Sequence, residues 1–165
     1  MTGSHFLPRS YRAILSLVVL FVICRSVCFA PQPPLEPNRA ERQRLAEQYV
    51  HEKLPFWQRK LALEAWNVSI VAVHPSDLRP GTLGNVHWDK EKKTATIRVL
   101  DAGDYRTPFL ATLNDLEFTV VHELIHLELA SLPRSDESRS DEEHAINNLA
   151  DALLKFERAK PQPAR

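Results

Sequence analysis

Cysteine, glycine and methionine are all scarce in this chain of 165 residues. The two cysteines, Cys24 and Cys28, lie in an apolar N-terminal segment, so the rest of the chain offers no disulfide framework and no thiol nucleophile. Four glycines are too few for a glycine-rich loop that cradles phosphates. Neither sign of charge is in excess, because 21 basic residues stand against 21 acidic ones. These absences argue against thiol enzymes, nucleotide-binding loops and nucleic-acid binding by bulk positive charge.

The N-terminal segment has the layout of an export signal. Arg9 and Arg12 precede the apolar run Ala13–Cys24, and Cys28-Phe29-Ala30 offers a small residue at a cleavage position. The run is too short to span a bilayer comfortably. We therefore expect residues 1–30 to be a signal peptide or a membrane anchor of an exported, periplasmic or secreted protein that has no other membrane contact. The alternative is a start codon placed too early, which would leave the protein in the cytoplasm.

The rest of the chain divides into three parts. Prolines dominate residues 31–37, which predicts a stiff linker. Residues 38–158 carry the periodic apolar pattern of one domain, and residues 159–165 are expected to form a disordered tail. Residues 1–30 contain three arginines and no acidic residue, so the chain without them is slightly acidic. A nucleic-acid partner is therefore not expected.

Periodicity within the domain predicts an α+β fold. Asn38 is a capping residue for a first helix, and Pro55 should end that helix and start a second one. The last two strands are joined by a short charged turn, which predicts an antiparallel hairpin. A capping box of Asn114 and Glu117 predicts the start of a long apolar helix. The expected elements are helices at about 39–53 and 55–66, strands at 68–73, 86–88 and 94–100, and helices at about 114–131 and 141–158.

The motif that carries chemistry lies inside this long apolar helix. His122 and His126 are four residues apart, so both imidazoles project from one face and can bind the same metal ion. Glu123, beside the first histidine, is placed to act as a general base on a water molecule at that ion. Three ionisable residues in an otherwise apolar helix would be costly to bury without a partner, whereas a metal ion satisfies both histidines. The pattern therefore predicts a Zn²⁺ site, the alternative being two hydrogen-bonded core histidines.

A catalytic zinc needs a third protein ligand, and the sequence offers three candidates. The glycine and the third histidine of the extended HExxH motif are absent, because their positions hold Leu129 and Leu132. Glu143 shares the apolar stripe of the last helix, with Asn147 one turn later to orient a ligand, and is favoured over Glu142 and His144. Glu143 also fits a structural role, because it completes a capping box with Ser140.

Two segments resemble a known family. TVVHELIHLEL at residues 119–129, followed by EEHAINNLADALL at residues 142–154, is similar to the zincin metallopeptidases that use a glutamate as third zinc ligand. With Trp57–Trp66, which reads WQxxLxLxxW, the likeness extends over roughly residues 47–156 to small metallopeptidase-like proteins of bacteria and phages. It implies Zn²⁺ held by His122, His126 and Glu143 in a compact zincin-like domain. It also implies an edge strand that aligns an extended substrate, here residues 94–100.

The expected function is hydrolysis of peptide bonds in a peptide or protein substrate, with water activated by zinc and Glu123 as general base. This chain has no obvious tyrosine, histidine or arginine at a motif position to stabilise the oxyanion. His87 and Tyr105 are the only candidates. The alternative function is a zinc-binding interaction or sensor domain without catalysis, which would have no need of Glu123. A zinc ribonuclease is disfavoured by Glu123 and by the slightly acidic charge. The sequence leaves the oligomeric state open.

Overall fold

The computed structural model describes residues 36–132 and 139–161, which fold into three long helices and a three-stranded mixed sheet. The expected α+β fold is confirmed at this level. The predictions for the export segment, for most of the linker and for residues 162–165 fall outside the described residues. Within those described, no helix is long and apolar enough to cross a membrane.

The sheet has the order β1-β3-β2. β1 (Asn67–Val73) runs parallel to β3 (Thr94–Leu100), and β2 (Gly84–Asp89) pairs with β3 in antiparallel fashion, as the hairpin pattern predicts. Alternate residues of β3, namely Ala95, Ile97 and Val99, are buried toward the helices. The expectation that residues 94–100 form an edge strand is wrong, because the parallel return of β1 places β3 in the centre. The edges are β1 and β2.

A single helix, α2 (Arg39–Lys60), stands where two were expected. The side chain of Asn38 accepts a hydrogen bond from the backbone N–H of Glu41, as predicted for the cap. Pro55 lies inside the helix and removes one backbone hydrogen bond without ending it. Val50, Leu54 and Trp57 lie on one stripe and are all buried, and the burial of these side chains outweighs the lost bond.

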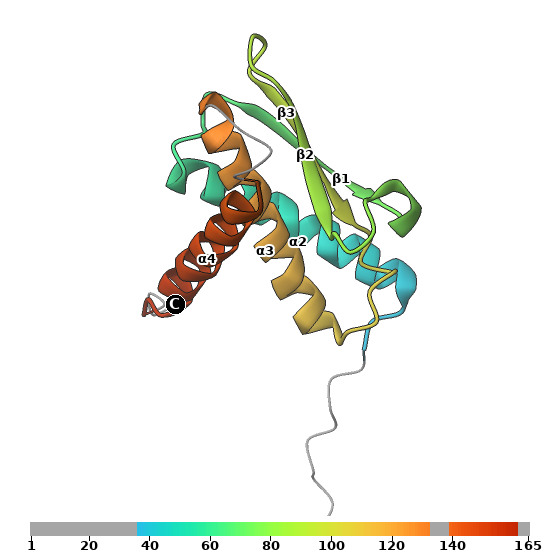
Figure 1. The fold of residues 1–165 in the computed structure, drawn as a ribbon. Helices are drawn as coiled ribbons and strands as arrows, with labels where there is room; N and C mark the ends of the chain where they lie inside the picture. Colours follow the sequence, from blue (N-terminus) through green and yellow to red (C-terminus); the bar gives the residue numbers. More distant parts are fainter. Residues whose placement is uncertain (1–35, 133–138, 162–165) are drawn as a thin grey trace, which may run out of the picture. The chain divides into compact units, whose positions relative to one another are not determined.

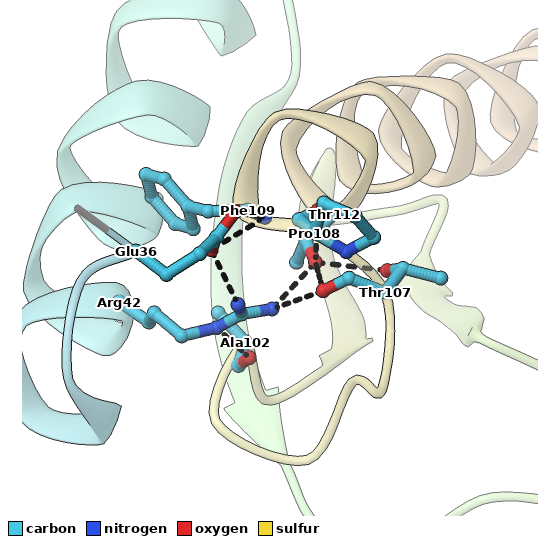
Figure 2. Close-up of polar contacts among 7 residues, drawn as sticks. All are labelled: Glu36, Arg42, Ala102, Thr107, Pro108, Phe109 and Thr112. Atoms are coloured by element: carbon cyan, nitrogen blue, oxygen red, sulfur yellow. Dashed lines mark hydrogen bonds and ion pairs between the residues drawn. The ribbon is translucent and has the colours of Figure 1, made fainter. Parts of the chain in front are cut away.

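The long apolar helix, α3 (Phe109–Glu128), begins five residues before the predicted capping box, so Asn114 and Glu117 lie within the helix. The groups that cap the first turn of α3 come from the N-terminal end of the domain. The carboxylate of Glu36 accepts the backbone N–H of Phe109 at 3.0 Å, and Arg42 binds Glu36, the Thr107 carbonyl and the Thr112 hydroxyl (Figure 2). Because this cap is 73 residues away along the chain, no local pattern could reveal it.

Helices α2 and α3 pack against the sheet, and α4 (Arg139–Arg158) packs on α3 (Figure 1). α3 lies against β2, β3 and α2. Ser140 lies inside α4, so its predicted role as an N-cap is not observed. Two short 3₁₀ turns complete the fold, η1 (Pro75–Asp77) and η2 (Leu129–Ser131). The shared core is formed by large side chains with almost no exposure, among them Trp57, Leu63, Ile97, Leu116, Leu124, Ile125 and Ile146.

Candidate metal centre

Three side chains from two helices converge at one point. His122 and His126 lie one turn apart on α3, and their Nε2 atoms are 3.0 Å from each other. Glu143, in the first turns of α4, brings Oε2 to 3.3 Å from His122 Nε2 and Oε1 to 3.3 Å from His126 Nε2. Donor atoms of all three residues lie within 4.8 Å of one another.

The spacing of these donor atoms fits a small tetrahedral ion. Ligands at about 2.0–2.2 Å from a tetrahedral zinc lie roughly 3.3–3.6 Å from one another. Both distances between Glu143 and the histidines match this range, and the distance between the histidines is slightly shorter. Two imidazoles and one carboxylate also form a ligand set that leaves a fourth position for water. The geometry therefore suits a catalytic zinc better than it suits a closed structural site.

The two other candidates for third ligand occupy different places. Glu142 lies on the far side of the second histidine, with Oε1 at 3.6 Å from His126 Nδ1. It can therefore orient the ring of His126, a role that sequence reasoning considered only for Asn147. His144 is exposed on α4 and is not part of the converging group.

Burial and the neighbouring side chains shift the pKa of His122 in different directions. Burial lowers the pKa of this imidazole, and the neighbouring His126 lowers it further. Glu143 and a hydrogen bond with the side chain of Asn147 raise it, but less strongly. The net lowering keeps the ring neutral near pH 7, and neutral imidazole is the form that binds a metal.

Glu123 lies beside the converging group but faces the sheet. It is 7% exposed, and burial raises the pKa of its carboxyl to about 7, with the negative charge of Glu143 acting in the same direction. A Cβ atom at Gly84 of β2 would lie 3.6 Å from Glu123 Oε1 and would clash with Thr119 Cγ2. Glycine at this position therefore lets β2 pass close to the helix beside Glu123. Sequence reasoning missed Gly84, although a glycine at the start of a strand often marks such a close approach.

The two oxyanion candidates are not among the converging residues. Tyr105 is near Asp115, about two turns before His122 on α3, and burial raises the pKa of its phenol. Its hydroxyl is buried with no hydrogen-bond partner among the described residues. His87 is exposed on β2, on the face opposite to that of Gly84. The position of His87 does not support the expected role, and the role of Tyr105 stays a prediction.

The group consists of the three residues that the sequence favoured as ligands, and Glu123 lies beside it, while the binding of a metal stays a prediction. Comparisons of the chain with models of protein families, with curated proteins and with solved structures give no match.

Proposed function

We propose that the protein is a zinc-dependent metallopeptidase of the zincin type. The observation that carries this proposal is the convergence of His122, His126 and Glu143 at tetrahedral spacing, with Glu123 buried beside them. A bound Zn²⁺ would act as a Lewis acid that lowers the pKa of water and polarises a carbonyl group. His122, His126 and Glu143 are the protein groups that would hold it.

Glu123 is the residue that would move protons. Its carboxylate would take a proton from the attacking water, hold it while the water oxygen adds to the peptide carbonyl carbon, and deliver it to the leaving nitrogen. The C–N bond then breaks, and the products are a carboxylate and an amine. Because Glu123 is nearly enclosed by α3 and β2, its carboxyl keeps one orientation through both transfers.

The edge of β2 is the element that would align the substrate. The backbone N–H of Leu100 donates to the carbonyl of Leu83. By the alternation of an antiparallel ladder, Gly84, Val86 and Trp88 then direct their N–H and C=O groups toward the open edge. An extended peptide paired with this edge would pass near Glu123, because a Cβ atom at Gly84 would lie 3.6 Å from Glu123 Oε1.

Metal content and hydrolysis of the full chain test this proposal together. We expect about one zinc per chain after dialysis, and cleavage of a fluorogenic peptide library that stops on addition of a chelator. Glu123→Gln should retain zinc yet reduce kcat by a factor of about 10² to 10⁴. Glu128→Gln, an exposed acid of the same helix, is the matched control and should change neither. Equal cleavage by Glu123→Gln and parent would contradict the mechanism, and zinc without any cleavage would favour a non-catalytic zinc-binding domain.

A further inference from the structure

Among the residues that the structure describes, nothing protects the β1 edge of the sheet against pairing with another strand. β1 is seven residues long and contains no charged residue, no proline and no glycine. Edge strands in soluble proteins are normally kept short, charged, kinked or covered, because an open edge is a template for another strand. A strand of this kind indicates that another segment covers it in the working protein.

The register of β1 shows which backbone groups are available. Asn67 donates its N–H to the Lys93 carbonyl, and the Val73 carbonyl accepts the N–H of Asp101. In a parallel ladder the residues that bond the neighbouring strand alternate with residues that point away from it. The N–H and C=O groups of Val68, Ile70 and Ala72 therefore face the open edge. The described part of the chain provides no backbone partner for them outside the sheet.

A cavity of about 290 Å³ lies directly beside two of these residues, Ile70 and Ala72. Ile70, Ala72 and Val99 line it from the sheet, and Ala46 and Val50 line it from α2. Val99 on the central strand is buried, whereas Ala72 on β1 is exposed. The volume is at the lower limit for a small-molecule site, so it suits one or two side chains of a peptide better than a cofactor.

The polar residues at the cavity give it a negative character. They are Gln43, Glu47, His51 and Asp101, and no lysine or arginine is among the lining residues. Gln43 donates to the Asp101 carboxylate at 2.8 Å, which leaves the negative charge in place. A second copy of the chain could pair through β1, but its Ile70 would stay in its own sheet and leave the cavity unfilled. The pairing would also bring the Glu47 and Asp101 carboxylates of the two copies near one another. A basic partner is therefore the better complement.

We propose that the β1 edge and this cavity together bind an extended segment of a partner protein. Its backbone would pair with Val68, Ile70 and Ala72, one apolar side chain would enter the cavity, and a lysine or arginine on the same face would lie near Glu47 and Asp101. This binding edge is separate from β2, because β3 lies between the two strands. The proposal does not depend on peptidase activity.

The test uses a blocked, fluorescent seven-residue peptide with leucine at its centre, lysine two positions to either side and threonine elsewhere. Binding to the full chain with Glu123→Gln, which prevents cleavage, is followed by fluorescence anisotropy with and without EDTA. We expect saturable binding that EDTA does not change. Replacement of both lysines by glutamate, or N-methylation of alternate peptide bonds, should weaken it at least tenfold.

Matched substitutions separate the two edges of the sheet. Ala72→Pro removes an outward N–H from β1, and Val86→Pro removes one from β2; each is tolerated in principle because neither N–H takes part in the ladder. Circular dichroism should show that both variants are folded. Ala72→Pro and Glu47→Lys should weaken binding at least tenfold, whereas Val86→Pro and Glu91→Lys, a charge reversal in the β2–β3 turn, should change it less than twofold.

Three results would overturn the proposal. The first is loss of binding in Val86→Pro but not in Ala72→Pro, which would place the peptide on the β2 edge. The second is a dimer of the full chain that Ala72→Pro dissociates, which would make a second copy the occupant. The third is slow hydrogen exchange of the Ile70 amide in the monomeric chain without peptide, which would mean that the chain covers its own edge.

Discussion

At the scale of single residues, Glu142 and Glu143 are neighbours in sequence with different relations to the histidines. Glu143 reaches the Nε2 atoms of both rings, whereas Glu142 approaches the Nδ1 atom of His126 alone. The first position would suit a ligand of the proposed zinc ion, and the second would suit a group that orients such a ligand. Adjacent carboxylates can therefore be told apart by which ring nitrogen they face.

This difference predicts unequal losses of zinc affinity. Substitutions that remove an orienting group typically weaken metal binding about 10–100-fold, and loss of a ligand should exceed that range. We expect Glu143→Gln to weaken zinc binding more than 100-fold and Glu142→Gln about tenfold, measured by competition with a zinc chelator. His144→Ala, one residue further on and exposed, is the control and should leave affinity unchanged. A larger loss in Glu142→Gln than in Glu143→Gln would reverse the assignment.

At the scale of elements, the sequence predicted what depends on local pattern. The alternation of residues 94–100 predicts β3 to the residue, and Asn38 predicts the start of α2. The position of β3 in the sheet could not be predicted, because the parallel pairing with β1 depends on contacts that no local period records. The converging His122, His126 and Glu143 were foreseen because helical spacing fixes the first two and an apolar stripe orients the third.

The start of α3 also could not be predicted from local pattern, because it depends on residues that are distant in the sequence. Its cap depends on Arg42, a largely buried residue of α2 that donates to Thr107, Thr112 and Ala102 while binding Glu36. The side chain also lies over the ring of Phe109, with its guanidinium carbon 5.5 Å from the ring centroid. One side chain thus joins the segment before α2, the loop after β3 and the first turn of α3.

Removal of this side chain should therefore destabilise the domain. Arg42→Ala removes the donor to the Ala102 carbonyl and to the Thr112 hydroxyl, both partly buried, and each such loss costs about 1–3 kcal/mol. We expect the free energy of unfolding, measured with urea, to fall by about 2–4 kcal/mol in total. Arg44→Ala, an exposed arginine on the same helix, should change it by less than about 0.5 kcal/mol. Equal effects of the two substitutions would show that the contacts in Figure 2 contribute nothing to stability.

At the scale of the whole molecule, one buried carboxylate connects all three helices. Glu117 of α3 accepts hydrogen bonds from Tyr49 at 2.7 Å and Trp57 at 3.0 Å, both on α2. Lys53 of α2 approaches it at 3.1 Å, and Arg158 near the end of α4 at 3.5 Å. Because Glu143 is also on α4, the contact with Arg158 helps to hold the helix that carries the proposed third ligand.

The charge on Glu117 should make the stability of the domain depend on pH. Burial alone raises the pKa of this carboxyl, but the hydrogen bonds from Tyr49 and Trp57 and the charge of Lys53 outweigh it, so the pKa is lowered from its ordinary value of 4.5. A carboxyl with a lowered pKa in the folded state stabilises the fold above the pKa of the unfolded chain. That contribution is lost as the pH falls through the lower, folded-state value.

Unfolding of the parent and of Glu117→Gln at several pH values tests this contribution. At pH 7 we expect the variant to be less stable by about 1–3 kcal/mol, because the amide cannot pair with Lys53 and Arg158. The gap should narrow as the pH drops below about 4.5, since the parent carboxyl then takes up its proton and loses the same pairing. Glu128→Gln, an exposed acid on the same helix, should show no comparable change with pH. A difference in unfolding free energy between parent and Glu117→Gln that stays constant to pH 3, or widens on acidification, would mean that Glu117 is not ionised in the folded protein. Packing, not charge, would then join the three helices at this point.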